Sequence, residues 1–237
     1  MSERQVVLDT ETTGIDPKSG HRIIEIGCVE LIDRQLTGNH YHQYINPDRA
    51  IEAEAQAIHG ISAQMLKDEP FFKDIAVEFV NFINGAELII HNAPFDVGHI
   101  NAEFERLPGS IGLQTADITH ICSILDTLKM ARRKHPGQRN SLDALCKRYG
   151  IDNSQRTLHG ALLDSEILAE VYLAMTGGQM ELSFDMGSNQ KANADASSEF
   201  TRPNKAFKVI EAQASELQAH QDMLTKLESI SGVRLWV

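Results

Sequence analysis

The chain has 237 residues, of which 42% are hydrophobic and 23% are charged, and its formal net charge is −11. This composition is typical of a globular protein with a buried core, and no apolar run is long enough to suggest a membrane span. The three cysteines lack metal-ligand spacing, so we interpret them as reduced thiols and expect a cytoplasmic protein without a signal peptide. The negative charge argues against a protein that coats duplex DNA by electrostatics alone. It does not exclude an enzyme that acts on nucleic acid at a metal site.

The first predicted strand carries acids where strands normally have none. Residues 6–8 are apolar and predict a buried strand, which continues through Asp9 and Glu11. Because side chains alternate along a strand, these two acids point to the same side, about 6.6 Å apart along the chain. Two interpretations remain open at this point: an exposed strand end whose acids face water, or half of a site for Mg²⁺ or Mn²⁺.

The rest of the chain predicts strands first and then alternating helices and strands. We expect an antiparallel meander with strands at 22–31 and 41–45 and a turn at Gly38-Asn39. The later expected elements are short helices at 51–58 and after Ser62, a helix at 71–83, a strand at 87–90, a helix at 95–107, a strand at 121–125, a helix ending near Lys134, a helix capped by Asn140 that ends near Tyr149, and a helix at 161–175. This order predicts an α/β fold in which helices cover a mixed sheet.

Two of these helices place acids on the faces that should pack against the sheet. Asp96 lies on the apolar stripe of the helix at 95–107, and Asp164 lies on that of the helix at 161–175. Either acid could instead be a first-turn carboxylate that complements the helix dipole. Buried ionised carboxylates are costly unless they are paired or bound to metal. Together with Asp9 and Glu11, these inward acids therefore point to a shared cation site.

His159 precedes Asp164 by five residues, which is about 500° around a helix, so the two side chains cannot share a helix face. We therefore expect His159 in the loop or first turn before that helix, with Gly160 giving the bend. A lone histidine is commonly a hydrogen-bonded structural residue. Beside a cluster of carboxylates and metal, however, it could take a proton from water near neutral pH.

Three motifs resemble, in order and residue type, those of the DEDDh 3′–5′ exonucleases. They are Asp9-Thr10-Glu11, then Asp96 after His91-Asn92-Ala93-Pro94-Phe95, then His159 with Asp164. Longer runs at 139–146, 157–164 and 167–179 are similar to the epsilon proofreading subunits of bacterial DNA polymerase III. The resemblance is strong from residue 4 to about 184 and loose beyond. It implies a ribonuclease H-like fold, with a mixed five-stranded sheet flanked by helices.

The resemblance also implies a mechanism, in which His159 is the general base for hydrolysis at a single-stranded 3′ end of DNA. The metal ligands that it implies, for two Mg²⁺ or Mn²⁺ ions, are Asp9, Glu11, Asp96 and Asp164. The substrate-binding residues that it implies are Asp9, Glu11, Glu54, His59 and Asp164. One ion would lower the pKa of the attacking water and the other would stabilise the leaving 3′ oxygen. The products would be nucleoside 5′-monophosphates, released during proofreading of DNA synthesis.

Two further features stay open between a functional and a structural interpretation. Asp126, at a predicted strand end, could support the site or be structural. A basic cluster could guide the phosphate backbone or could be a solvated helix face and loop. The members of this cluster are Lys129, Arg132, Arg133, Lys134 and Arg139.

The segment after Gly178 suggests contacts with partners. Gln179, Leu182 and Phe184 form the pattern Q-x-x-L-x-F, which resembles the short peptides by which polymerase subunits dock into the sliding clamp. A chance sequence at a helix end is the alternative. Residues 187–198 are rich in Ser, Asn, Ala and Gln and predict a flexible linker.

A final helical pattern has no core of its own to bury against, and such a helix is marginal in water. Its apolar members are Ile210, Leu217, Leu224, Leu227 and Ile230. The resemblance implies that this segment, with Trp236, docks on the polymerase alpha subunit, and that a theta subunit covers the nuclease domain. We thus expect an exonuclease domain at 1–178, a clamp motif and linker at 179–198, and a polymerase-binding segment at 199–237.

Two rival functions fit parts of the pattern. An RNA-trimming exonuclease of the same superfamily would carry the same catalytic residues, but would need no polymerase tether after Gly178. A replisome scaffold that has lost its chemistry would not need the four acids and the histidine, all of which are present.

Overall fold

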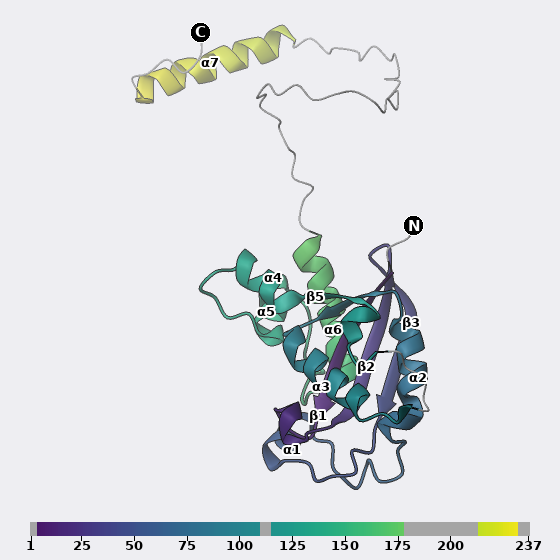
Figure 1. Ribbon diagram of the computed structural model, residues 1–237. Helices are drawn as coiled ribbons and strands as arrows, with labels where there is room; N and C mark the ends of the chain where they lie inside the picture. Colours follow the sequence, from purple (N-terminus) through teal and green to yellow (C-terminus); the bar gives the residue numbers. More distant parts are fainter. Residues whose placement is uncertain (1–3, 110–114, 178–212, 232–237) are drawn as a thin grey trace, which may run out of the picture. The chain divides into compact units, whose positions relative to one another are not determined.

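The computed structural model describes residues 4–109, 115–177 and 213–231 (Figure 1). The chain divides into two compact units, Met1–Ser183 and Phe184–Val237. The predicted clamp motif and linker at 179–198 lie outside the described residues, so the predicted domain boundary stays a prediction. In the described parts of the chain, every helix is too short or too polar to span a bilayer.

The first unit is built on one mixed sheet of five strands, as predicted. The strands are β1 (Arg4–Thr12), β2 (Ile23–Ile32), β3 (Gln35–Tyr44), β4 (Glu87–Ile90) and β5 (Ser123–Asp126). Their spatial order is β3-β2-β1-β4-β5. The first three strands form an antiparallel meander, while β4 and β5 run parallel to β1. The ends of β1 and β4 therefore meet at the same edge of the sheet.

Helices cover both faces of this sheet (Figure 1). They are α1 (Ala53–His59), α2 (Phe72–Ile83), α3 (Ala93–Glu105), α4 (Thr127–Lys134), α5 (Leu142–Tyr149) and α6 (Ala161–Thr176). Val6 and Leu8 of β1 belong to the apolar core that α2 and α3 form with one face. Val7 belongs to the second core, which α5 and α6 form with the other face. The alternation along β1 thus divides its side chains between two cores.

The turn between β2 and β3 lies elsewhere than predicted. Gly38-Asn39 lies inside β3, and the chain turns at Asp33 and Arg34, whose φ angles are 49° and 65°. A type I′ hairpin turn needs positive φ at both central positions, which glycine and asparagine adopt more easily than arginine. Here Arg34 adopts it while its guanidinium donates to the Leu173 carbonyl oxygen at 3.1 Å, so the turn is held by the end of α6.

Two predicted helix starts are also wrong. The segment after Ser62 forms turns and no helix. A helix there would have little room, because Pro70 disfavours helical backbone in the residue before it. The cap of α5 is Ser141, whose Oγ accepts from the Ala144 backbone N–H at 3.4 Å. Asn140, the predicted cap, is buried just before it and donates to backbone carbonyls of the preceding loop.

The described element of the second unit is α7 (Ala214–Ser231), which confirms a helix in the C-terminal pattern. The side chain of Leu217 on this helix is exposed. Ile210 and Trp236, which the sequence assigned to the same partner-binding segment, lie outside the described residues.

Candidate active site

The end of β1 presents its two acids to α6. Asp9 and Glu11 lie on the same side of β1 as Val7, which faces the core beneath α6. Asp9 pairs in register with Gly27 of β2, and a Cβ atom at Gly27 would lie 2.2 Å from the Ala161 carbonyl carbon. A glycine is therefore required there, because the N-terminus of α6 sits directly on the strand beside the acids.

Asp96 approaches the same edge of the sheet from the other face. After β4 ends, the chain turns through Asn92, whose φ of 71° is left-handed, and α3 begins at the next residue. This places Asp96 in the first turn of α3, where it is 2% exposed. Thr10 points to this face of β1, and its hydroxyl donates to Asp96 Oδ1 at 2.7 Å. The predicted inward direction of Asp96 is thus correct.

The loop before α6 holds His159, as predicted, and Gly160 is the residue that precedes the helix. The His159 backbone N–H donates to the Ile58 carbonyl oxygen at 3.1 Å, so the loop is fixed to the end of α1. Asp164 follows in the first turn of α6 and is 3% exposed. His159 and Asp164 therefore reach the acid cluster from a loop and a helix whose relative positions are set by backbone contacts.

Glu25 of β2 is a supporting residue that the sequence reasoning missed. Its Oε2 accepts from the Ala161 backbone N–H at 3.1 Å, and its Oε1 lies 2.7 Å from Nε2 of His42. This buried carboxylate thus satisfies a free N–H group at the start of α6 and holds that helix on the sheet. The available signal was an acid flanked by isoleucines in a buried strand.

The donor atoms at the centre of the cluster suit a hard divalent cation. One ligand atom each from Glu11, His159 and Asp164 lie within 4.8 Å of one another. Glu11 Oε1 is buried and has no hydrogen-bond partner among the described residues. A buried carboxylate oxygen without a donor is costly, and a cation would satisfy it. Asp9 and Asp96 are not part of that three-residue group, but they lie close enough to act on it electrostatically.

The electrostatics of the cluster show the same need for positive charge. Burial, and then repulsion from Asp96, Glu11 and Asp164, raises the pKa of Asp9 well above its ordinary value. Burial is also the main reason that the pKa of Glu11 rises to about 8 and that of Asp96 to about 7. These acids therefore favour either protons or a bound cation near neutral pH.

His159 is suited to accept a proton. Burial, and then the nearby Arg156 guanidinium, lowers its pKa below the ordinary histidine value. The imidazole is therefore neutral at pH 7, while its side chain remains 45% exposed towards the hollow in front of the acids.

Arg156 is the most prominent residue of the site that the sequence reasoning missed. It lies in the loop between α5 and α6, and its side chain is 7% exposed. Its guanidinium forms a two-pronged ion pair with Asp164, with Nε–Oδ1 and Nη2–Oδ2 distances of 2.5 and 2.8 Å. The available signal was a single arginine three residues before His159, in a loop that leads to an acid on an apolar face.

Two hollows meet at the acids. One, of about 330 Å³, is lined by Glu54 and His59 of α1 together with Asp9, Glu11, Asp96 and His159. The other, of about 540 Å³, is lined by Asp9, Arg132, Asn140, Asp143, Arg156, His159 and Asp164, among others. The structure thus brings the predicted substrate residues of α1 next to the acids.

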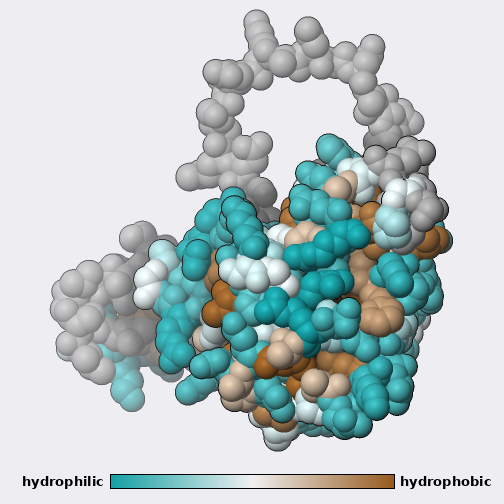
Figure 2. Space-filling view, turned by 60° about the horizontal axis from the view of Figure 1, so that its bottom comes forward, coloured by the Kyte–Doolittle hydropathy of each residue, from teal (hydrophilic) through white to brown (hydrophobic). Residues whose placement is uncertain are grey.

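Figure 2, with the lower end of Figure 1 turned forward, shows hydrophobic side chains among a mainly hydrophilic surface. Ile15 and Ile58 are exposed members of the first hollow.

The two features left open by the sequence have different outcomes. Asp126 is the cap of α4, since its Oδ1 accepts from the backbone N–H groups of Leu128 and Lys129 at 2.9 and 3.1 Å. That is a structural role. In the basic cluster, Arg132, Arg133 and Lys134 are all exposed in the last turn of α4, and Arg132 also lines the second hollow.

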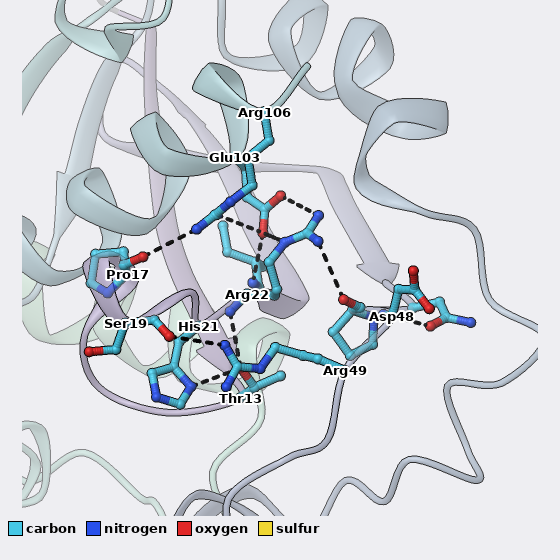
Figure 3. A network of polar contacts seen from close by, with 12 residues as sticks. Thr13, Pro17, Ser19, His21, Arg22, Asp48, Arg49, Glu103 and Arg106 are labelled. Atoms are coloured by element: carbon cyan, nitrogen blue, oxygen red, sulfur yellow. Dashed lines mark hydrogen bonds and ion pairs between the residues drawn. The ribbon is translucent and has the colours of Figure 1, made fainter. Parts of the chain in front are cut away.

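A second buried ionic network lies at the start of β2 (Figure 3). Glu103 of α3 accepts from Arg22 Nε and Nη2 at 2.6 and 2.8 Å and from the Ile23 backbone N–H at 3.2 Å. Arg106 lies 3.8 Å from the same carboxylate. These contacts fasten α3 to the β1–β2 connection, so the network is structural.

The comparisons with known proteins agree with this geometry. A family model described as exonuclease matches residues 6–172. The DNA polymerase III subunit epsilon of Salmonella typhimurium is 49% identical over 239 residues, which cover 98% of this chain and 97% of that protein. The protein of the same name from Escherichia coli K12 is 48% identical, with the same coverage.

Solved structures show the same architecture. Exonuclease X in complex with 5′ overhanging duplex DNA is 28% identical, with a TM-score of 0.55 over 73% of this chain and 91% of that one. The zinc-bound complex of E. coli exonuclease I with single-stranded DNA has a TM-score of 0.61 over 76% of this chain and 41% of that one. At 19% identity, this second likeness shows the fold alone.

Proposed function

The chain belongs to the exonuclease family and, within it, to the epsilon subunits of bacterial DNA polymerase III, and from this premise we propose how its residues perform the reaction. Its activity is that of a metal-dependent 3′–5′ exonuclease that proofreads DNA synthesis. The proposal concerns the residues that carry this activity, the ions that they hold and the partners of the tail.

Two Mg²⁺ or Mn²⁺ ions are held, in this proposal, by Asp9, Glu11, Asp96 and Asp164. When bound, such ions activate water and stabilise the negative charge of a leaving oxygen. The neutral imidazole of His159 takes the proton from the water that attacks the terminal phosphodiester. Glu54 and His59 line the adjoining hollow and hold the terminal nucleotide there. The products are nucleoside 5′-monophosphates.

One observation carries this assignment: Glu11 Oε1 is buried without a hydrogen-bond partner, inside a cluster of acids with raised pKa values. A cation of the charge and hardness of Mg²⁺ or Mn²⁺ would satisfy this oxygen and offset the repulsion between the acids.

The test is digestion by the full chain of a primer with a 3′ mismatch, with single-stranded RNA as the competing substrate. We expect release of 5′-monophosphates from the DNA with Mg²⁺ or Mn²⁺ and none with a chelator. Preferred digestion of the RNA would contradict a proofreading role, and digestion in the chelator would contradict the metal site.

The partner contacts are placed in the tail. We propose that Gln179, Leu182 and Phe184 bind the sliding clamp and that the segment from residue 199, including α7, binds the polymerase alpha subunit, while a theta subunit covers the nuclease domain. The exposed Leu217 of α7 supports a partner-binding helix. A cytoplasmic location accords with this role and stays a prediction.

A chain that ends at Gly178 tests the tail. It should degrade free single-stranded DNA at the rate of the full chain but fail to co-elute with the polymerase. The triple variant Gln179→Ala, Leu182→Ala, Phe184→Ala should weaken binding to the clamp alone. Co-elution of the truncated chain with the polymerase would place the tether in the nuclease domain.

A further inference from the structure

Arg156 places a positive charge inside the cluster that is proposed to bind metal. All three guanidinium nitrogens are engaged: Nε and Nη2 with the two oxygens of Asp164, and Nη1 with Asp143 Oδ1 at 2.8 Å. Nη2 also lies 3.1 and 3.2 Å from the two ring nitrogens of His159. One cationic nitrogen is therefore within hydrogen-bond distance of two of the three groups that could share an ion.

This position conflicts with a bound divalent ion. An ion of this kind lies about 2.0–2.1 Å from its oxygen ligands, so at Asp164 it would approach the nitrogens that now contact the same two oxygens. The charges of the ion and the guanidinium also repel each other, at a place where burial weakens the screening by water. Arg156 and the ion therefore compete for the Asp164 carboxylate.

Asp143 offers the arginine an alternative anchor. It lies on α5, outside the acid cluster, and its side chain is 62% exposed. Its Oδ1 already accepts from Arg156 Nη1 and, at 3.0 Å, from Asn153 Nδ2. The guanidinium can thus leave Asp164 without losing every ionic contact, since Nη1 already contacts Asp143 and both residues line the second hollow.

We propose that Arg156 is an internal counter-ion, which occupies Asp164 in the metal-free protein, is displaced from it by the incoming divalent ion, and is then retained by Asp143. Metal binding at this site is a cation exchange. Arg156 is a positioning residue here, since it holds Asp164 and His159 in place until the ion arrives. The inference rests on the metal site proposed above.

The alternative role for Arg156 predicts the opposite change in metal affinity when the arginine is removed. If the arginine kept its contact with Asp164 in the loaded site, it would hold the ligand in the geometry that the ion needs. Removing it would then weaken metal binding. Under cation exchange, removal of the competitor tightens metal binding, and the metal-free protein loses stability because Asp164 is left buried without a counter-charge.

The test is a calorimetric titration of the metal-free full chain with MnCl₂, together with thermal unfolding in chelator and in saturating Mn²⁺. We expect Arg156→Met to bind Mn²⁺ at least about ten-fold more tightly than the wild type, because a charge-assisted contact no longer has to be broken. It should melt earlier than the wild type in chelator, and saturating Mn²⁺ should remove most of that difference. Arg156→Lys keeps the charge but not the planar guanidinium, so its Mn²⁺ affinity should lie between those of the wild type and Arg156→Met.

The matched control is Arg148→Met. Arg148 is also a hydrogen-bonded arginine close to the second hollow, but it bonds Asn140 and the Arg139 carbonyl oxygen, away from the acids. Its loss should leave the Mn²⁺ affinity unchanged. Asp164→Asn tests the metal site itself and should greatly weaken Mn²⁺ binding.

The outcomes separate the two proposals. If Asp164→Asn weakens binding while Arg156→Met and Arg156→Lys bind as the wild type does or more weakly, the exchange is refuted and the metal site stands. If the wild type and Asp164→Asn bind Mn²⁺ equally, or neither binds it, the metal site is refuted and the exchange with it.

Discussion

Helix α3 carries two buried acids, Asp96 and Glu103, about two turns apart, and their surroundings differ. Glu103 is 1% exposed, and both of its oxygens accept hydrogen bonds from the Arg22 guanidinium (Figure 3). Asp96 is equally buried but lies among other acids, and its pKa rises to about 7. Glu103 has its counter-charge in Arg22. In the other cluster Arg156 pairs with Asp164, and Asp9, Glu11 and Asp96 have no ion-pair partner among the described residues.

The difference shows what separates a structural buried acid from a functional one. A carboxylate whose oxygens all accept hydrogen bonds within the fold has a structural role. Its removal should lower the free energy of unfolding. A group of carboxylates with an orphaned oxygen, such as Glu11 Oε1, is strained in the metal-free protein and gains from a cation. Two acidic residues on one helix can therefore serve different purposes.

Removing an acid of the unsatisfied cluster should have the largest effect. Asp9→Ala, Glu11→Ala and Asp164→Ala should each abolish nearly all 3′–5′ cleavage, because the ions lose a ligand. Glu11→Ala should leave the metal-free melting temperature unchanged or raise it, since it removes like-charge repulsion. Turnover by initial-rate assay and unfolding by circular dichroism check both parts. Undiminished digestion by Asp164→Ala would show that the metal site has been placed wrongly.

His159→Ala should have the next largest effect. General-base catalysis is typically worth about 10²–10⁴-fold, so kcat should fall by that factor while Mn²⁺ binding is little changed. The lowered pKa of His159 predicts that the wild-type rate rises with pH below neutrality, as the imidazole loses its proton. The variant should lose this rise. Identical pH profiles for both proteins would mean that His159 is structural.

Glu103→Gln tests the satisfied cluster. It leaves the buried end of Arg22 without its counter-charge, and breaking such a pair typically costs about 3–5 kcal/mol. Chemical denaturation should show a loss of this order in the free energy of unfolding, while folded protein keeps its kcat in saturating Mn²⁺. A stable variant with little activity would place Glu103 in the functional cluster.

The smallest expected effect is a pH dependence of stability. Folding raises the pKa of Glu11 from 4.5 to about 8 and that of Asp96 from 3.8 to about 7, so the folded state favours their protonated forms. Their contribution to stability is complete below pH ~4 and is lost as the pH rises to about 8. In chelator, the melting temperature should therefore be lower at pH 8 than at pH 6, by about 2–4 °C for each kcal/mol lost. Saturating Mg²⁺ should remove this fall, and a rise with pH in chelator would contradict it.

Much of this site could be predicted from the sequence, because the signal was an acid in a place that acids avoid. Asp9 and Glu11 interrupt an apolar strand, and Asp96 and Asp164 interrupt apolar helix faces; the structure brings all four to one end of the sheet. The strand and helix order also predicted the mixed sheet, since strand-like segments come first and then alternate with helical ones.

The rest depended on contacts between distant residues. The sequence does not show that Glu103 pairs with Arg22, 81 residues away. Periodicity alone therefore cannot distinguish the structural acid Glu103 from Asp96. Arg156 lies in a loop without periodicity, and its partner Asp164 becomes evident only in three dimensions. The turn at Asp33-Arg34 was missed because Gly38-Asn39 has the more usual turn residues. The observed turn is held by contacts of Arg34 with the end of α6, which the sequence does not show.

The most direct measurement of the difference between the two clusters is Mn²⁺ binding, by calorimetry, to the metal-free wild type, Glu11→Gln and Glu103→Gln. The wild type and Glu103→Gln should bind Mn²⁺ with the same affinity, and Glu11→Gln should bind it much more weakly. Equal losses in the two variants, or binding that survives in Glu11→Gln and fails in Glu103→Gln, would contradict the assignment of the unsatisfied acids as the metal site.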